Sequence, residues 1–111
     1  MATETNIEVY QIVFGKEFLK ELKKIIKGGN KRIEQQVKDT FKELKLNPHR
    51  KRPKLDLKLI SSKSEAVYRV RIGKYRLVYQ IDEPEKKIFV TMIFPRGKGY
   101  QSIFYLLDVD N

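Results

Sequence analysis

Hydrophobic and polar residues follow two different periods along this chain, and the change of period divides it into elements. Residues 7–14 alternate well enough to predict a first strand. Apolar residues from Phe18 to Ile26 then follow helical spacing, with lysines on the other face. A second helical stripe runs from Ile33 to Leu44. The pattern therefore predicts a strand followed by two amphipathic helices.

The breaks between these segments contain residues that favour helix ends. Gly28 and Gly29 are expected to end the first helix, and Asn30 is a suitable N-cap for the second. Asn47 and Pro48 are expected to stop the second helix. The two helices should form an antiparallel hairpin whose apolar stripes need a sheet to cover.

Strand periodicity returns in the second half of the chain. After a basic linker at residues 49–53, Leu55–Leu59 is predicted to be a short extended piece. The strands that follow are predicted at residues 66–72, 75–82 and 87–94, with turns at 73–74 and 83–85. Residues 101–108 are expected to close the chain as a short helix or an edge strand.

Together these elements predict an α+β fold in a single domain, residues 1–111. An N-terminal strand and a two-helix antiparallel hairpin precede a three-stranded antiparallel β-meander, and the helices are expected to pack on one face of the sheet. Side chains alternate between the two faces of a strand. Arg69 and Arg71 should therefore point to the open face, away from the helices.

Among the features of the composition, the charge distribution gives information about binding partners. The net charge is +10, and eleven Lys or Arg against two acids lie between Lys45 and Arg76. Such clustering predicts an electrostatic footprint for nucleic acid or for an acidic protein. A simple solubility role is the alternative. An anionic membrane is a poorer partner, because the basic residues follow strand patterns and not one amphipathic helix.

Other classes of protein are excluded or disfavoured. No apolar run approaches the roughly 20 residues of a membrane helix, and the first residues lack a secretory signal. The absence of cysteine excludes disulfides and cysteine-ligated zinc and fits a cytoplasmic location. The single histidine, His49, excludes a two-histidine ribonuclease mechanism, and in a mobile linker it is expected to be solvated. We also expect no metal and no cofactor.

Residues 68–79, Tyr-Arg-Val-Arg-Ile-Gly-Lys-Tyr-Arg-Leu-Val-Tyr, form the most informative stretch. Its cations alternate with apolar residues along one predicted hairpin. Such a site can cleave RNA, because the ribose 2′-hydroxyl is an internal nucleophile and guanidinium groups can neutralise the charge that grows on the phosphorane. Lysines are expected to follow the phosphates without sequence specificity, namely Lys54, Lys58, Lys74 and Lys98.

This stretch resembles the RelE/ParE superfamily of toxins from type II toxin–antitoxin systems, and more closely its RelE branch. The resemblance covers nearly the whole chain and implies a RelE-like microbial ribonuclease fold. It implies metal-independent cleavage of mRNA in the ribosomal A site. It also implies a cognate RelB-like antitoxin that wraps the toxin in a hetero-oligomer and blocks it.

The resemblance implies site residues one by one. Arg69 and Arg71 fall on the family's basic-x-basic pair, and Arg76 falls on the arginine of its Tyr-Arg-Leu-Val-Tyr strand. Arg96 matches the arginine after the last long strand. The family often uses a tyrosine near the C-terminus, for which we prefer Tyr100 over Tyr105, although neither has the family's spacing.

The departures from the family pattern leave alternatives open. Arginine stands where well-known members have a lysine pair, and arginine accepts a proton poorly. This favours transition-state stabilisation over general base catalysis and implies weaker activity. The alternatives are a ParE-like inhibitor of DNA gyrase without nuclease activity, and a catalytically weak homologue that acts mainly by binding its antitoxin. At single positions, Arg76 could be a structural cation paired with Asp82 or Glu65, and Tyr75 and Tyr79 could be core aromatics.

Overall fold

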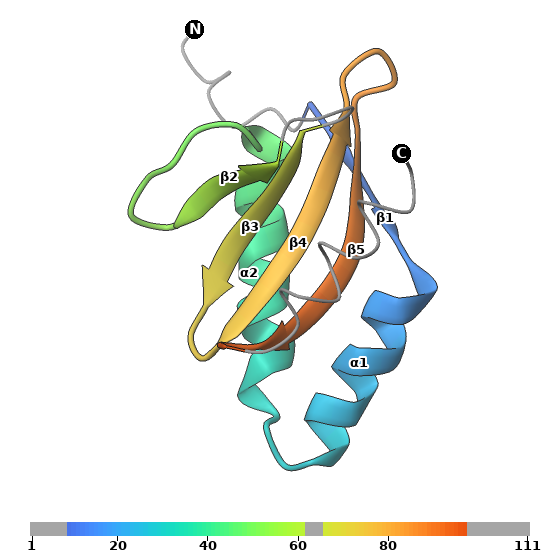
Figure 1. The fold of residues 1–111 in the computed structure, drawn as a ribbon, viewed down its shortest axis with the longest axis vertical. Helices are drawn as coiled ribbons and strands as arrows, with labels where there is room; N and C mark the ends of the chain where they lie inside the picture. Colours follow the sequence, from blue (N-terminus) through green and yellow to red (C-terminus); the bar gives the residue numbers. More distant parts are fainter. Residues whose placement is uncertain (1–8, 62–65, 98–111) are drawn as a thin grey trace, which may run out of the picture.

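A computed structural model describes residues 9–61 and 66–97, which form two helices and a five-stranded sheet (Figure 1). In chain order the elements are β1 (Gln11–Phe14), α1 (Lys16–Lys27), α2 (Arg32–Leu46), β2 (Leu57–Ser61), β3 (Val67–Ile72), β4 (Tyr75–Asp82) and β5 (Lys87–Pro95). The predicted α+β class is confirmed. The predicted closing segment at residues 101–108 lies outside the described residues, as do the first residues of the predicted N-terminal strand.

The helix ends lie within one residue of the predicted positions, with Lys31 and not Asn30 as the N-cap of α2. Helix α1 ends at Gly28, whose amide donates to Lys24 O at 2.9 Å. Asn30 Oδ1 accepts a hydrogen bond from the amide of Ile33 at 3.2 Å, which satisfies one of the free amides at the start of α2. Asn47 is the C-cap of α2, as predicted.

Arg52, in the linker that follows α2, caps the C-terminal end of this helix with its side chain. Its guanidinium donates to Glu43 O at 2.7 Å and to Asn47 O at 2.9 Å, and it forms an ion pair with the Glu43 carboxylate at 3.1 Å. Carbonyls at a helix C-terminus lack partners within the helix, so a fixed cation there satisfies them. The linker was predicted to be mobile, but this capping arginine holds it against the helix.

The sheet has the order β1-β5-β4-β3-β2, in which β1 is parallel to β5 and all other neighbours are antiparallel. The extended piece predicted near Leu57 is a full strand, β2, paired with β3, so the meander has four strands where three were expected. The alternation of Leu55, Leu57 and Leu59 predicts extended backbone here, but it does not show that the segment pairs with β3. The β3–β4 turn requires glycine, because Gly73 has a φ of +59°.

Both helices lie on one face of the sheet, with α2 behind it in Figure 1. The main core forms between the helices and this face, as predicted. Its fully buried side chains from the helices and the sheet include Phe18, Ile33, Leu44, Val70, Leu77, Tyr79, Ile88 and Ile93. A smaller apolar cluster of Val67, Val78 and Phe94 lies apart from this core. No helix in the described ranges is both long and apolar enough to cross a membrane.

Candidate functional site

The strand register places the predicted arginines on one face of the sheet. Arg71 of β3 lies directly opposite Arg76 of β4, and Arg69 lies opposite Val78. On the other side of β3, Lys58 of β2 is the partner of Arg69. Directly opposed residues of antiparallel strands share a face. These cations therefore lie on the face that the helices leave uncovered.

Burial on this face differs from what the sequence suggested. Arg69 is 8% exposed and Arg76 is 7% exposed, whereas Arg71 is largely exposed. The expectation of a solvated row of cations is therefore wrong for two of the three. The physical reason is that the same face carries apolar neighbours: Val78 lies opposite Arg69, and Phe94 lies opposite Arg76.

The three guanidinium groups have different partners. Arg76 Nη1 donates to Gly73 O at 3.1 Å and to Tyr75 O at 2.9 Å, which folds the side chain back onto the β3–β4 turn. Arg71 Nη1 lies 3.7 Å from a carboxylate oxygen of Asp56. Nε and Nη1 of Arg69 are buried and have no hydrogen-bond partner within residues 9–61 and 66–97. A buried donor without a partner costs about 1–3 kcal/mol.

The β3–β4 turn also brings the late arginine to this end of the sheet. The amide of Arg96 donates to Lys74 O at 2.6 Å, just after Tyr75 pairs with Pro95. Arg96 and Lys74 are both exposed. Cations from β3, β4, the turn and the end of β5 thus gather at one end of the sheet, which we call the hairpin end: Arg71, Lys74, Arg76 and Arg96.

Other predicted site residues lie elsewhere. Lys54 lines a shallow hollow with Asp39 and Glu43 of α2, so it belongs to the helix side of the molecule. Lys98 and Tyr100 lie outside the described residues, as does Tyr105. The catalytic tyrosine therefore stays a prediction.

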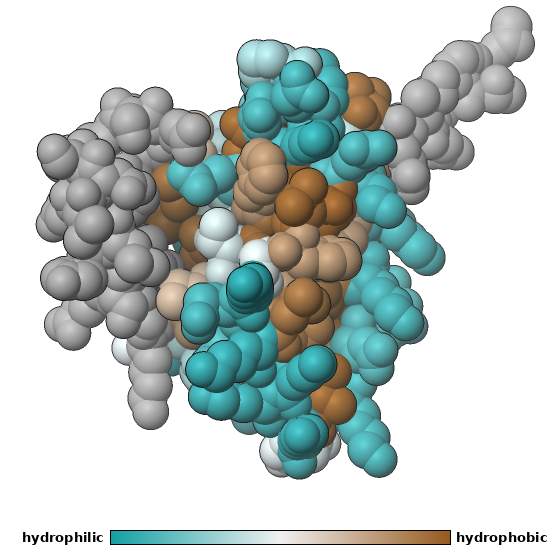
Figure 2. Space-filling view, turned by 90° about the vertical axis from the view of Figure 1, so that its right-hand side faces the viewer, coloured by the Kyte–Doolittle hydropathy of each residue, from teal (hydrophilic) through white to brown (hydrophobic). Residues whose placement is uncertain are grey.

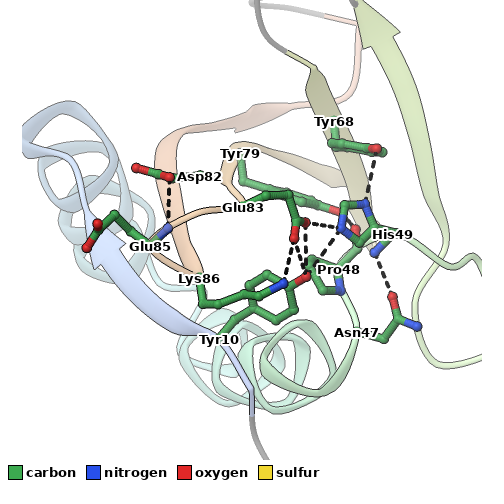
Figure 3. A network of polar contacts seen from close by, with 10 residues as sticks. All are labelled: Tyr10, Asn47, Pro48, His49, Tyr68, Tyr79, Asp82, Glu83, Glu85 and Lys86. Carbon is green, nitrogen blue, oxygen red and sulfur yellow. Dashed lines mark hydrogen bonds and ion pairs between the residues drawn. The ribbon is translucent and has the colours of Figure 1, made fainter.

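A second polar cluster lies at the opposite end of the sheet, where β4 turns into β5 (Figure 3). Glu83 in this turn forms an ion pair with His49 Nε2 and accepts hydrogen bonds from Tyr10 at 2.9 Å and from Lys86 at 2.8 Å. His49 Nδ1 lies 3.5 Å from the Tyr68 hydroxyl. We call these five residues the Glu83 network.

The expectation that His49 is merely solvated is therefore wrong. Its partners Glu83 and Tyr10 are 34 and 39 residues away in the chain, so no local spacing could have revealed them. The network ties the α2–β2 linker and the segment before β1 to the β4–β5 turn. It lies on the helix side, because Tyr10 and Tyr68 pack against the main core. The sheet separates it from the arginines.

The network shifts the acidity of its members. The hydrogen bond from Lys86, with further bonds from His49 and Tyr10, lowers the pKa of Glu83 to about 2. The hydrogen bond to Glu83 in turn raises the pKa of Lys86. Partial burial, together with the neighbouring Glu83, raises the pKa of Tyr10. All three groups are therefore held in their ordinary charge states near neutral pH.

Tyr79 belongs to the core, which is the structural alternative that the sequence left open. Its ring stacks on Tyr68 with centroids 5.4 Å apart, and its buried hydroxyl donates to Pro48 O at 2.8 Å. Burial raises the pKa of this hydroxyl well above its ordinary value. Such a group is suited to packing and not to proton transfer. Within the described ranges, no three His, Asp or Glu side chains gather closely enough to hold a metal ion.

Residues 12–100 match the family described as ParE toxin of the type II toxin–antitoxin system, parDE. This chain belongs to the RelE/ParE family of toxins. A relative from Methanocaldococcus jannaschii that carries the name RelE1 is 33% identical over 97 residues, covering 87% of this chain and 96% of the relative. The resemblance of residues 68–79 to this family is thereby confirmed.

Solved structures of the family share the fold of this toxin. The archaeal RelE–RelB complex from Pyrococcus horikoshii OT3 matches with a TM-score of 0.68 and 24% identity, covering 82% of this chain and 99% of that one. The RelB–RelE antitoxin–toxin complex from Methanococcus jannaschii matches with a TM-score of 0.53 and 26% identity, covering 85% and 96%. Both neighbours are complexes of RelE with RelB, and the second is described as an antitoxin–toxin complex.

Proposed function

We propose that this toxin is an endoribonuclease that cleaves mRNA in the ribosomal A site, without a metal or cofactor. The observation that carries the proposal is the hairpin end. Arg71 and Arg76 lie directly opposite each other, and Arg96 is bonded through its amide to the intervening turn. Guanidinium groups from three strands can therefore approach one phosphate from different directions. Such groups are planar, permanently charged and able to donate two parallel hydrogen bonds.

In the proposed reaction the substrate supplies its own nucleophile. The ribose 2′-oxygen forms a bond to phosphorus while the bond to the 5′-oxygen breaks, which leaves a 2′,3′-cyclic phosphate and a 5′-hydroxyl. The arginines stabilise the negative charge that develops on the non-bridging oxygens. Arginine cannot take the proton of the 2′-hydroxyl. We assign that proton to water or to Tyr100.

In this proposal the lysines bind the phosphate backbone and the arginines stabilise the transition state. Lys58 and Lys74 flank the arginines on exposed positions and would contact successive phosphates. Lys54 and Lys98 would extend the same electrostatic track. Arg69 is set apart by burial, and its Nε and Nη1, which have no partner in the described part of the chain, would donate to an approaching anion.

A cognate RelB-like antitoxin is the proposed inhibitor, and the active toxin works on ribosomes in the cytoplasm. Support comes from the two solved relatives, which are both complexes of RelE with RelB, one of them described as an antitoxin–toxin complex. The net charge of +10 would attract an acidic partner. We expect a toxin–antitoxin hetero-oligomer.

Purified ribosomes programmed with a defined mRNA test the nuclease proposal. The variant Arg71→Ala/Arg96→Ala changes two exposed residues, so it should fold normally. We expect cleavage to fall at least about 100-fold, because loss of one such donor alone costs about 100- to 1,000-fold. Lys38→Ala on α2 is the matched loss of an exposed cation and should cleave as the wild type does. Undiminished cleavage by the double variant would refute the assignment.

One observation favours a second candidate. The family that matches this chain is described as the ParE toxin. The main alternative is therefore a ParE-like toxin that inhibits DNA gyrase and has no nuclease activity. Induction would then trigger DNA-damage signalling while translation and mRNA stay intact. A gyrase supercoiling assay with the purified toxin separates the two activities directly.

The burial of Arg69 and Arg76 favours a third candidate, a catalytically weak toxin that acts chiefly through its antitoxin. Such a protein would bind programmed ribosomes or antitoxin normally and leave the message uncut. A binding assay run beside the cleavage assay distinguishes it from the nuclease.

A further inference from the structure

A hollow lies between the start of α2 and the β3–β4 turn, which are both toward the lower end of the view in Figure 1. Its volume is about 230 Å³, below the roughly 300 Å³ at which pockets for drug-sized ligands begin. It therefore has room for one small planar group and not for a larger ligand. We call it the turn pocket, and six residues line it: Asn30, Arg32, Gln36, Gly73, Lys74 and Tyr75.

The turn pocket shares a wall with the proposed reaction site. Arg76 Nη1 donates to the carbonyls of Gly73 and Tyr75 at 3.1 Å and 2.9 Å. The amide of Arg96 donates to the carbonyl of Lys74 at 2.6 Å. Each of the three turn residues that line the pocket therefore bonds through its carbonyl to an arginine of the hairpin end. Only this turn separates a ligand in the pocket from a phosphate that these arginines hold.

The wall formed by α2 supplies amide side chains. Gln36 lies four residues after Arg32, so both lie on one face of the helix. A methyl group at Gly73 would lie 3.8 Å from Gln36 Nε2, so this amide lies against the turn. The side chain of Gln36 is exposed and has no hydrogen-bond partner among the described residues. An amide of this kind can donate and accept at once, which suits the edge of a nucleobase.

An aromatic ring and two cations complete the turn pocket. Tyr75 packs against the main core and is partly exposed, so its ring is fixed on one side and accessible on the other. Bases of single-stranded RNA stack on such rings. Arg32 and Lys74 are exposed, and no carboxylate within residues 9–61 and 66–97 pairs with either of them. Exposed cations beside a base site are suited to bind the flanking phosphates.

The polar lining distinguishes the turn pocket from the apolar surface of the molecule. Figure 2 looks onto the side with β1 and α1, where apolar surface runs between charged residues. None of the exposed large hydrophobic residues in the described ranges lines the turn pocket. A ligand with a hydrogen-bonding edge, a planar face and a negative charge therefore fits the pocket better than an apolar segment does.

We propose that the turn pocket binds the base of an unpaired mRNA nucleotide that adjoins the scissile phosphate, and that it prefers adenine. The base stacks on Tyr75, and the amide of Gln36 pairs with N6 and N7 of adenine. Arg32 and Lys74 hold the neighbouring phosphates. Gln36 is thus a specificity-determining residue. The inference rests on the proposed nuclease function.

The same features argue against a simple anion as the occupant. A free phosphate would use the two cations but would leave the Gln36 amide and the Tyr75 ring without a contact. The start of α2 is also not an open anion site, because Asn30 Oδ1 already accepts a hydrogen bond from the amide of Ile33. A nucleotide uses the amide, the ring and the cations together.

Nuclear magnetic resonance of the full-length ¹⁵N-labelled toxin tests the pocket without ribosomes. The probes are AMP, UMP and inorganic phosphate. We expect AMP to shift the side-chain amide signal of Gln36 and the backbone amide of Gly73, and UMP to bind about 10-fold more weakly. Gln36→Ala should weaken AMP binding about 10-fold. Gln35→Ala is the matched control, because Gln35 bonds to Asp39 on α2 and does not line the pocket, and it should bind AMP as the wild type does.

Cleavage on programmed ribosomes tests the same preference with messages that carry adenine or uracil at the nucleotides flanking the scissile phosphate. The wild type should cut the adenine message about 10-fold faster, and Gln36→Ala should reduce this ratio to about one. The pocket proposal is overturned by equal or absent binding of AMP and UMP, by the same shifts with inorganic phosphate alone, or by a ratio that Gln36→Ala leaves unchanged. Absence of cleavage of both messages would refute the nuclease proposal, whereas cleavage without discrimination between the bases would refute the pocket proposal alone.

Discussion

The two ends of the sheet both contain charged groups, but the bonding of these groups differs. In the Glu83 network, Lys86 and His49 share one carboxylate, and the Tyr10 hydroxyl bonds to it as well. At the hairpin end and beside it, Arg76 bonds to backbone carbonyls and Arg69 leaves two nitrogens without a partner in the described ranges. Paired charges hold segments of the chain together. In the described residues, two donors of Arg69 have no such partner, and we propose that they serve a ligand.

The contributions of the two regions to folding stability differ in the same sense. Ion pairs between exposed groups contribute about 0–1 kcal/mol each, because water and salt screen them. The Glu83 network therefore fixes the position of the linker more than it stabilises the fold. Buried guanidinium nitrogens without an acceptor work against folding, so the two nitrogens of Arg69 that lack one among the described residues need a reason other than stability. Anion binding, as proposed above, would supply that reason.

Of the substitutions considered, Arg69→Met should have the largest effect. It should separate the effect of this arginine on stability from its proposed role in RNA cleavage. Methionine fills similar space without the unsatisfied donors, so we expect the free energy of unfolding to rise by about 1–3 kcal/mol. RNA cleavage should fall about 100- to 1,000-fold, if each guanidinium acts as an oxyanion donor does. Urea unfolding and the ribosome assay measure the two quantities.

Arg71→Met is the matched control, since this arginine is exposed. Its unfolding free energy should stay within about 0.5 kcal/mol of the wild type, as for most surface substitutions. If Arg69→Met instead destabilises the toxin strongly, the buried guanidinium has a structural partner and the comparison between the two ends fails.

Much of the fold could be predicted from the sequence, because the local patterns agree with the tertiary structure. The glycines after α1, Asn30 before α2 and the Gly73 turn all act locally, so their positions determine the ends of elements. Strand β2 was only partly predicted, since the alternation of Leu55, Leu57 and Leu59 indicates an extended segment but not its pairing with β3. The parallel pairing of β1 with β5 joins distant segments, and no pattern within either strand specifies it.

The site was predicted less completely than the fold. Alternation correctly placed Arg69 and Arg71 on one face, because side-chain parity is a local property. It could not predict that Arg69 and Arg76 are buried, since burial depends on apolar neighbours from other strands, such as Phe94. The role of His49 was missed for the same reason. Its partners come from residues before β1 and from the β4–β5 turn.

Tyr79→Phe should produce the next largest effect on stability. The buried hydroxyl donates to Pro48 O, and its loss leaves that carbonyl without this bond. We expect the free energy of unfolding to fall by about 0.5–1.5 kcal/mol with cleavage unchanged. Tyr75→Phe, on a partly exposed residue of the same strand, is the control and should have a smaller effect on stability. A loss of cleavage in Tyr79→Phe would assign this tyrosine to the reaction and not to the core.

Glu83→Gln should destabilise the toxin less than the change at Tyr79. Glutamine keeps the shape but removes the charge that Lys86 and His49 share. Since these groups are substantially exposed, we expect a loss below about 1 kcal/mol and no change in cleavage. Hydrogen exchange should accelerate in the linker near His49, because the network holds it. Equal exchange in both proteins would mean that Arg52 alone fixes the linker.

The smallest expected effect is a pH dependence that belongs to Glu83. Its pKa is lowered to about 2 in the folded toxin from an unfolded value of 4.5, so the folded state prefers the ionised form. The corresponding stability is fully present above about pH 4.5 and is lost as pH falls toward 2. Unfolding measured across this window should show a shallower acid slope in Glu83→Gln than in the wild type. The slope should be unchanged in Glu85→Gln, which removes a carboxylate of the same turn that has no bond to Lys86. Identical slopes in all three proteins would show that the network does not couple protonation to folding, and the contrast with the arginines would then rest on geometry alone.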